Sequence, residues 1–490
     1  MDQPSLRRVD AESSAIEEAA RHLRRGGLVA FPTETVYGLG ANAARQGAVE
    51  SLYRLKQRPA DHPLIVHVAG VADASCWARL NPRALALIGA LWPGPLTLVL
   101  ARRPDSPKYA CAGQKTIALR CPSHPVARAL LGHFSALGGK GVAAPSANPY
   151  GRLSPTDADQ VEEDLQAMMQ AHALGRKRIQ DPEIPDCWLI DGGTCAEGIE
   201  STVLDLSGDA PQVLRPGAIP RQQIEALLGL EVPWVRVTEP ALSRKDRGGA
   251  AGDRGSGASI RSGRPGSGTP SRERPKVSGT HLSHYAPRKP LILTDGPNLG
   301  AKLGELAAQG ISAVAVWGDS ADAAAKGGAL GQASAMGAVS GAGFAHGLKI
   351  DQQSLPGSVQ ELAQQLYRQL RRMDQSEAEV LLVVLPMPLP QAGSASEEGA
   401  AGALSSPEWE AVLDRLQRAA YATSVGLVRV SAAPTAAAEA QPTRAKPEAM
   451  RQSFVRSGSA QQEPMDQETL EPMTTAVDDL DFDVSFDDLG

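Results

Sequence analysis

The 490-residue sequence predicts an α/β protein with two domains. Amphipathic helical segments alternate with short apolar runs typical of buried strands over residues 12–235, and again over residues 288–430. Between them, residues 236–276 contain eight Gly and ten basic against four acidic residues, which is typical of a flexible basic linker; we extend this linker to residue 287. Residues 431–490 lose apolar periodicity and end in an acid-rich stretch, which predicts a disordered acidic tail.

The first domain is predicted to begin with a helix and a buried strand. Ser14 followed by Glu17 is typical of a capping box, Gly26 and Gly27 end the helix, and residues 28–31 form an apolar run. Further helices are expected near 49–56, from Pro82 with Asn81 as N-cap, from about His124 and from Thr156. Further strands are expected at residues 64–68, 96–101, 116–120, 142–144, 188–191 and 202–206.

The second domain is predicted to open with a βαβ unit. Its strands are PLILTD (residues 290–295) and ISAVAVWG (residues 311–318), with a helix over residues 299–309 between them. Residues 320–349 are rich in Ala, Gly and Ser and are expected to form a loop. A helix over 359–372, a strand over 380–385 and a helix over 407–420 follow.

Composition excludes several classes of protein. The five cysteines are odd in number and never spaced C-x-x-C, which argues against a disulfide framework and a zinc site. No run of about 18 apolar residues occurs, so we expect a cytoplasmic location. A net charge of -6 provides no overall attraction to nucleic acid, so any anion-binding surface must be local.

The segment PTETVYGLGANA, residues 32–43, follows the first strand and is rich in polar side chains. Thr33, Glu34, Thr35 and Tyr37 stand where open α/β sheets bind ligands, and the glycines allow close backbone approach to a ligand. A locally satisfied glycine turn is an equally good interpretation. The match to G-x-G-x-x-A is not a dinucleotide fingerprint, because it does not follow the strand directly, and no P-loop motif occurs.

Two further segments carry groups suited to anions. In KQRPADHPLIVHV, Lys56 and Arg58 could reach one phosphate chain, although a solvated basic helix end is the ordinary alternative. His67 in the same segment alternates with apolar residues, a pattern more often found for a hydrogen-bonded core histidine. The loop APSANPYGRLSPT offers donors for phosphate and ribose: Ser146, Asn148, Arg152, Ser154 and Thr156. Weaker candidates are Thr116, Arg120, Glu200, Ser201, Thr202 and Arg215.

Taken in order, these motifs resemble the YrdC family. They are PTETVYGLGANA, K-x-R-P with PLIVHV, WPGPLTLVL, T-x-A-x-R-x-P, APSAN, and G-x-EST followed by LRPG. HYAP at residues 284–287, followed by a second α/β domain, resembles the long two-domain form of the threonylcarbamoyl-AMP synthases. The resemblance implies a YrdC-like twisted open mixed sheet, followed by a smaller Rossmann-like α/β domain.

The resemblance also implies roles for particular residues. Threonine would be bound by Thr35, His67, Arg120, Ala144 and Ser201. ATP would be bound by Lys56, Arg58, His62, Thr116, Ser146, Asn148, Ser154 and Arg215, with Lys56 and Arg58 as electrostatic catalysts and His284 and Tyr285 as a lid. Two positions depart from the family pattern: His62 replaces a frequent Asn, and Leu282 replaces a frequent Tyr.

The implied reaction joins threonine, bicarbonate and ATP into an activated precursor for tRNA modification. Magnesium is expected on the ATP phosphates, with no metal ligand from protein side chains. Implied partners are tRNA, through double-stranded RNA binding, and a downstream threonylcarbamoyl transferase complex, but no membrane. An RNA-binding module without catalysis is the main alternative. A carbamoyl transferase like the hydrogenase maturation proteins is a third, which the missing Cys-rich modules disfavour.

Overall fold

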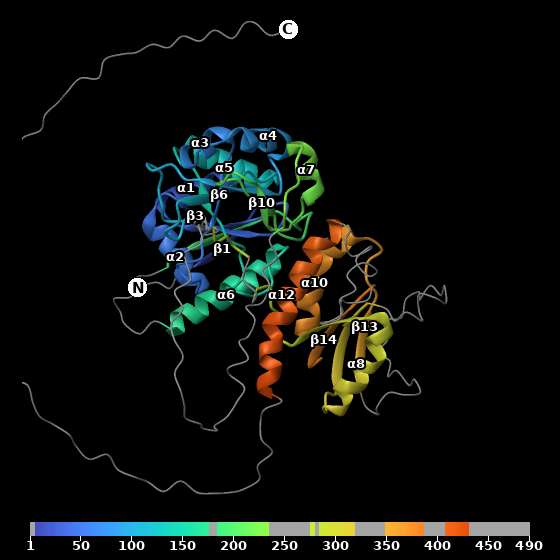
Figure 1. The fold of residues 1–490 in the computed structure, drawn as a ribbon. Coiled ribbons are helices and arrows are strands. Elements are labelled where there is room, and N and C mark those ends of the chain that lie inside the picture. The colour runs from blue at the N-terminus through green and yellow to red at the C-terminus, as the bar shows by residue number, and fades with distance from the viewer. Residues whose placement is uncertain are drawn as a thin grey trace, which may run out of the picture. The chain divides into compact units, whose positions relative to one another are not determined.

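The computed structural model describes residues 5–175, 184–234, 275–279, 284–318, 348–386 and 407–430 (Figure 1). Most of the predicted basic linker, Leu282, most of the Ala-rich loop and the acidic tail lie outside the described residues. Predictions about their order therefore stay predictions, as do the domain boundaries.

The first domain is built on a ten-stranded sheet in the order β1-β8-β2-β3-β7-β4-β6-β5-β9-β10, with both parallel and antiparallel pairs. The expected twisted mixed sheet is confirmed. Its strands are β1 Leu6–Asp10, β2 Leu28–Phe31, β3 Gly38–Asn42, β4 Ile65–His67, β5 Leu96–Ala101, β6 Thr116–Arg120, β7 Val142–Ala143, β8 Cys187–Asp191, β9 Thr202–Asp205 and β10 Gln212–Arg215.

Helices pack on both faces of this sheet. They are α1 Ser13–Arg25, α2 Gln46–Lys56, α3 Val71–Trp77, α4 Pro82–Leu91, α5 Pro125–Ala136, α6 Ala158–Gly175 and α7 Arg221–Leu228 (Figure 1). In β2, Leu28 and Ala30 join the core cluster that includes α2, α4 and α6, whereas Val29 and Phe31 join the cluster with α1 and α5. A strand covered on both faces buries every side chain, which explains its continuous apolar run.

Local signals at helix starts were right in one case and wrong in another. Asn81 caps α4 as expected, because its side chain accepts a hydrogen bond of 2.9 Å from the backbone N–H of Ala84. The capping box at Ser14 is wrong. Helix α1 begins at Ser13, and its N-cap Glu12 makes no side-chain capping bond.

Strand β3 forms where the sequence suggested a glycine turn. A Cβ at Gly40 would lie 2.7 Å from Cγ1 of Val142 and 2.9 Å from Cε1 of Phe31. The missing side chain therefore lets β3 lie between β2 and β7. At Gly40 the close approach is to protein rather than to a ligand, which corrects our expectation for this glycine.

The second domain has four parallel strands in the order β11-β14-β12-β13, which confirms the smaller Rossmann-like sheet. Its elements are β11 Leu291–Asp295, α8 Gly296–Ala308, β12 Ala313–Trp317, β13 Lys349–Gln353, α10 Val359–Gln375, β14 Val380–Leu385 and α12 Pro407–Val430. Strand β14 inserts between β11 and β12, so the two strands of the predicted βαβ unit are not neighbours. Strand β13 was not predicted, and α12 continues ten residues beyond its predicted end.

The two domains share a core cluster. Val36, Leu153 and Ile199 of the first domain pack with Tyr285 and with apolar residues of α10 and α12. Next to them the backbones approach closely, because a Cβ at Gly198 would lie 2.4 Å from Cα of Gln364. Helices α10 and α12 therefore pack directly beside loops of the first domain.

Candidate functional site

A small polar cleft lies where several strands of the ten-stranded sheet begin or end. All five residues of the predicted threonine set line it: Thr35, His67, Arg120, Ala144 and Ser201. Ser146 and Arg215 of the predicted ATP set line the same cleft. Residues distant in sequence are thus brought together, since the pairing of β4 with β6 and of β5 with β9 aligns their ends.

Arg120 and His67 form one wall of the cleft. They are direct neighbours in the parallel pairing of β4 with β6. Nη2 of Arg120 lies 2.9 Å from Oε1 of Glu34, whose other oxygen accepts a hydrogen bond of 3.1 Å from the N–H of Ser123. Burial and the charge of Arg120 lower the pKa of His67 to about 3, so the imidazole is neutral.

This wall keeps unused hydrogen-bonding capacity. Among the described residues, Nδ1 of His67 and Nε of Arg120 have no hydrogen-bond partner, although both atoms are buried. Buried polar groups are rarely left unpaired in native proteins, so these atoms are suited to a bound polar ligand. A guanidinium beside a neutral imidazole is well matched to a carboxylate.

Ser201 and Arg215 form a second wall and contact each other. Nη2 of Arg215 donates to the carbonyl of Ser201 at 2.8 Å and to its Oγ at 3.2 Å. Oγ of Ser201 also lies 2.8 Å from Oγ1 of Thr97, and Nη1 of Arg215 donates to the carbonyl of Ser278 at 3.0 Å. The predicted threonine and nucleotide sets therefore share this wall.

Lys56 and Arg58 are buried, so the alternative of a solvated basic helix end is wrong. They are 3 % and 7 % exposed, and neither lines the cleft. Nζ of Lys56 donates to the carbonyls of Ser146, at 2.6 Å, and of Asn148. Burial and the nearby Arg58 lower the pKa of Lys56 to about 7. Lys56 therefore stabilises the loop that carries Ser146.

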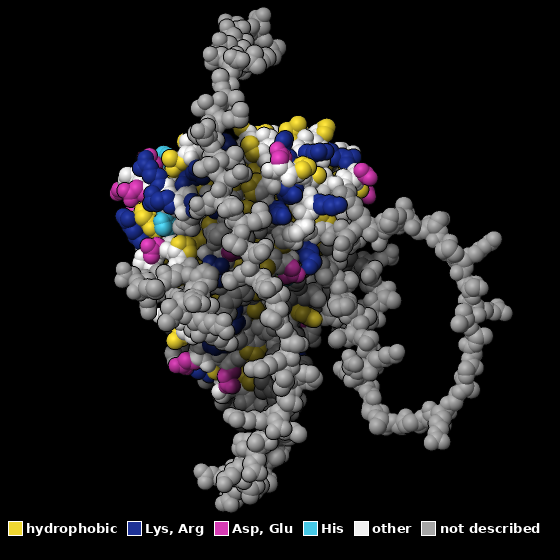
Figure 2. Space-filling view, turned by 90° about the vertical axis from the view of Figure 1, so that its left-hand side faces the viewer, with side chains coloured by type: hydrophobic (Ala, Val, Ile, Leu, Met, Phe, Trp, Pro, Cys, Tyr) yellow, Lys and Arg dark blue, Asp and Glu magenta, His cyan; other side chains and the backbone are white. Residues whose placement is uncertain are grey.

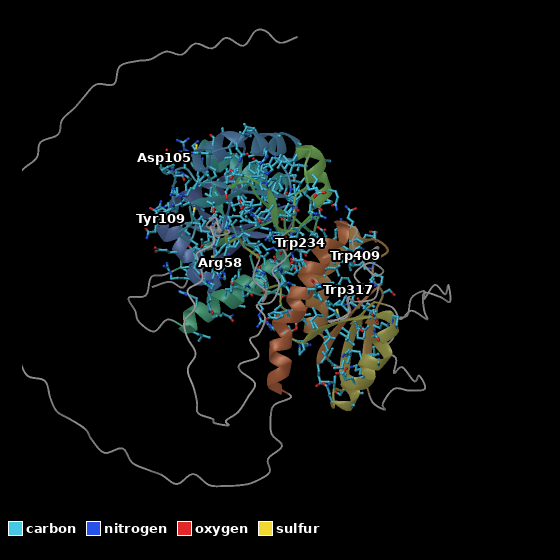
Figure 3. The ribbon with its side chains drawn as sticks, in the orientation of Figure 1. Arg58, Asp105, Tyr109, Trp234, Trp317 and Trp409 are labelled. Carbon is cyan, nitrogen blue, oxygen red and sulfur yellow. The ribbon has the colours of Figure 1, made fainter. Side chains whose placement is uncertain are left out.

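Arg58 is likewise bound to the protein, inside the first domain (Figure 3). It donates to the carbonyls of His62, at 3.2 Å, and Pro63, at 2.9 Å, and to Oγ of Ser278 at 3.4 Å. Its guanidinium carbon lies 5.5 Å from the ring centroid of Tyr150. Ser278 therefore contacts both Arg58 and Arg215, a partner that the sequence did not indicate.

The remaining predicted ATP residues lie outside the cleft. Thr116 lines a separate hollow beside Val277. Nδ1 of His62 lies 2.7 Å from the hydroxyl of Tyr150. Asn148 donates to backbone carbonyls of its own loop, and Ser154 donates to Oε1 of Glu200 at 2.7 Å.

The HYAP segment lies against the first domain and lines the cleft through His284 and Tyr285. The N–H of Ala286 donates to the carbonyl of Gly151 at 2.9 Å, and Arg152 donates to the carbonyl of Pro287 at 3.1 Å. The ring of Tyr285 also lies against Tyr367 of α10, with 5.8 Å between centroids. The segment thus contacts both domains, and its movement as a lid stays a prediction.

The first domain has an open mixed sheet with a cleft of Thr, Ser, Arg and His side chains, and a small parallel α/β domain is joined to it. These features define a YrdC-like protein of two domains. The family model Sua5_yciO_yrdC, described as "Telomere recombination", matches residues 21–217. The model of the threonylcarbamoyl-AMP synthase C-terminal domain matches residues 219–421. The chain belongs to the threonylcarbamoyl-AMP synthase family, so the resemblance is confirmed.

Individual relatives agree with this assignment. The chain is 33% identical to the threonylcarbamoyl-AMP synthase of Pyrococcus abyssi over 375 residues, which cover 76% of this chain and 88% of the relative. It is 38% identical to that of Bacillus subtilis over 284 residues, 57% of this chain and 67% of the relative. The crystal structure of P. abyssi Sua5 complexed with L-threonine matches with a TM-score of 0.59 and 29% identity, over 85% of this chain and 98% of that one.

Proposed function

We propose that this chain is an L-threonylcarbamoyladenylate synthase, a nucleotidyltransferase that forms threonylcarbamoyl-AMP and pyrophosphate from L-threonine, bicarbonate and ATP. The product serves N6-threonylcarbamoyladenosine modification of tRNA. One observation carries the proposal: the complete threonine set and two residues of the ATP set line a single cleft. Family membership favours this enzyme over the RNA-binding module and the carbamoyl transferase.

In this mechanism the protein positions reactants and neutralises charge. Arg120 binds the threonine carboxylate, and Ser201 hydrogen-bonds the same substrate. The threonine nitrogen forms a bond to the carbon of bicarbonate and water leaves, which gives a carbamate. A carbamate oxygen then forms a bond to the α-phosphorus of ATP while the bond from that phosphorus to the pyrophosphate oxygen breaks. Arg215 is only 3 % exposed and is placed to neutralise phosphate charge, because a charge away from water acts more strongly on its partner.

Lys56 and Arg58 are the proposed electrostatic catalysts. Lys56 binds backbone carbonyls, and Arg58 binds backbone carbonyls and Ser278. We propose that both exchange these partners for phosphate oxygens when ATP binds. Magnesium would arrive with the triphosphate and stabilise its charge. The cationic and hydroxylic groups of the cleft, such as Arg120, Arg215 and Ser201, fit the phosphate oxygens of such a complex.

Location and partners are proposed from the family. We propose a cytoplasmic location, as the family resemblance implies. No helix within the described ranges is both long and apolar enough to cross a membrane. Contact with tRNA, with the associated double-stranded RNA binding, and hand-over to a threonylcarbamoyl transferase complex are proposed as well. On the face shown in Figure 2, the described Lys and Arg side chains are interspersed with Asp and Glu. Filter binding of tRNA tests the contact.

The function is tested by incubating the purified chain with labelled threonine, bicarbonate and ATP, and detecting threonylcarbamoyl-AMP by chromatography. We expect the adenylate and pyrophosphate to appear in equal amounts, and only when all three substrates are present. Pyrophosphate release that does not depend on threonine would contradict the proposal.

A further inference from the structure

The carboxylate of Glu200 lines the cleft directly before Ser201, and groups from both domains bind it. Oε1 accepts hydrogen bonds from Oγ of Ser154, at 2.7 Å, and from the hydroxyl of Tyr367, at 3.0 Å. Oε2 accepts from the same hydroxyl at 2.9 Å and from Nε of Arg415 at 2.7 Å. Three of these four contacts come from α10 and α12 of the second domain.

Arg415 also holds the second residue of the wall that Ser201 and Arg215 form. Its Nη2 donates to the carbonyl of Pro216 at 2.9 Å, directly after Arg215. Its Nη1 donates to Asp414 at 2.6 Å, and its guanidinium carbon lies 5.0 Å from the ring centroid of Tyr285. One side chain of α12 therefore reaches the loop that carries Ser201, the residue that follows Arg215 at the end of β10, and the HYAP segment.

Glu200 needs these partners because it is an ionised group inside the protein. Burial alone would raise its pKa, but the charges of Arg415 and Arg215, with the hydrogen bonds from Arg415 and Ser154, lower the pKa to about 2. A buried charge that loses one partner keeps its desolvation cost without compensation. Without Arg415, the loop with Glu200 would rearrange toward water and displace Ser201 with it.

We propose that Tyr367 and Arg415 are positioning residues, through which the second domain fixes Glu200 and Pro216 and so places Ser201 and Arg215 for threonine and ATP. The inference rests on the proposed function. It assigns the second domain a direct part in forming the cleft. Neither residue belongs to the motifs by which the sequence resembles the family, and both act through loops rather than by touching a substrate.

The test uses the full chain with Tyr367→Phe, which removes only the hydroxyl and keeps the ring beside Tyr285. Threonine-dependent pyrophosphate release gives KM for threonine, KM for ATP and kcat, and thermal unfolding gives Tm. Loss of one hydrogen bond to a charged group should displace the loop that carries Ser201, and we expect about a tenfold higher KM for threonine, which corresponds to about 1.4 kcal/mol. Tm should fall by no more than a few degrees.

Arg221→Gln is the matched control. Arg221 pairs with Glu410 of α12 at 3.6 Å, so it crosses the same interface but contacts neither cleft loop directly. It should leave KM for threonine unchanged. Arg415→Met should raise KM for both substrates, and Arg415→Lys should recover part of the loss by restoring the charge beside Glu200.

Two results would overturn the proposal. The first is an unchanged KM for threonine in Tyr367→Phe. The second is a rise in KM for threonine in Arg221→Gln that equals the rise in Tyr367→Phe. If Arg415→Met fails to fold, the KM for threonine of Tyr367→Phe still decides whether the second domain positions the cleft. Product formation by the wild-type chain tests the proposed function separately. A wild type whose pyrophosphate release does not depend on threonine would refute that function. An active wild type with unaffected variants would refute only the positioning roles.

Discussion

Lys56 should make the stability of the protein depend on pH in a definite window. The lysine has an ordinary pKa of 10.5 and a pKa of about 7 in the folded chain. Between these values the unfolded chain binds the proton and the folded chain does not, so stability rises as pH rises through this window. A pKa lowered by about 3.5, at about 1.4 kcal/mol for each pKa unit, corresponds to roughly 5 kcal/mol as an upper limit.

The assay is urea unfolding of the wild type and Lys56→Met at pH 6, 8 and 9.5. We expect the difference in free energy of unfolding, wild type minus variant, to rise above pH 7 by up to about 1.4 kcal/mol per pH unit. Below pH 7 the difference should stay constant. The same substitution at the exposed Lys108 is the control. A difference that is equal at all three pH values would refute the reasoning about the buried ammonium.

Three further predictions concern the use of threonine and ATP. Arg58→Ala should weaken ATP use severely, and, because Arg58 is buried against two carbonyls, it should also lower Tm; near-normal pyrophosphate release would exclude the catalytic role. Ser201→Ala should raise KM for threonine more than KM for ATP, and equal effects in steady-state kinetics would argue against the division of roles. Deleting residues 278–287 and rejoining the domains with a flexible spacer should leave ATP binding measurable by calorimetry but cut product yield, whereas an unchanged yield would show that no lid exists.

The sequence predicted the elements whose signals are local. Strand β2 is an apolar run because it is covered on both faces, and α4 has a side-chain cap and a proline in its first turn. Strand β3 was missed because Gly38 and Gly40 suggest a turn when the sequence is considered alone, although packing against Val142 requires a glycine at position 40. The capping box predicted at Ser14 is wrong because the N-cap is Glu12, two residues earlier, and Glu12 makes no side-chain capping bond.

The candidate site shows the same limit. The threonine set was predictable from motif order, and the pairing of strands brings its members into one cleft. The burial of Lys56 and Arg58 was not predictable. Two cations at a helix end can be exposed to solvent or bound to backbone carbonyls, and the sequence does not distinguish these two arrangements. Tyr367 and Arg415 follow Glu200 by 167 and 215 residues, so no local pattern indicates that they meet.

Gly198 limits how the two domains could be recombined with those of relatives. Its φ is +70°, and a Cβ there would meet backbone atoms of residues 363 and 364 rather than a side chain that could rotate away. A chimaera with a foreign second domain would therefore need to reproduce the path of the α10 backbone at this point, and matching its side chains would not suffice. In the native chain, the methyl group of Gly198→Ala would overlap the α10 backbone. The substitution would therefore displace the loop that carries Glu200 and Ser201.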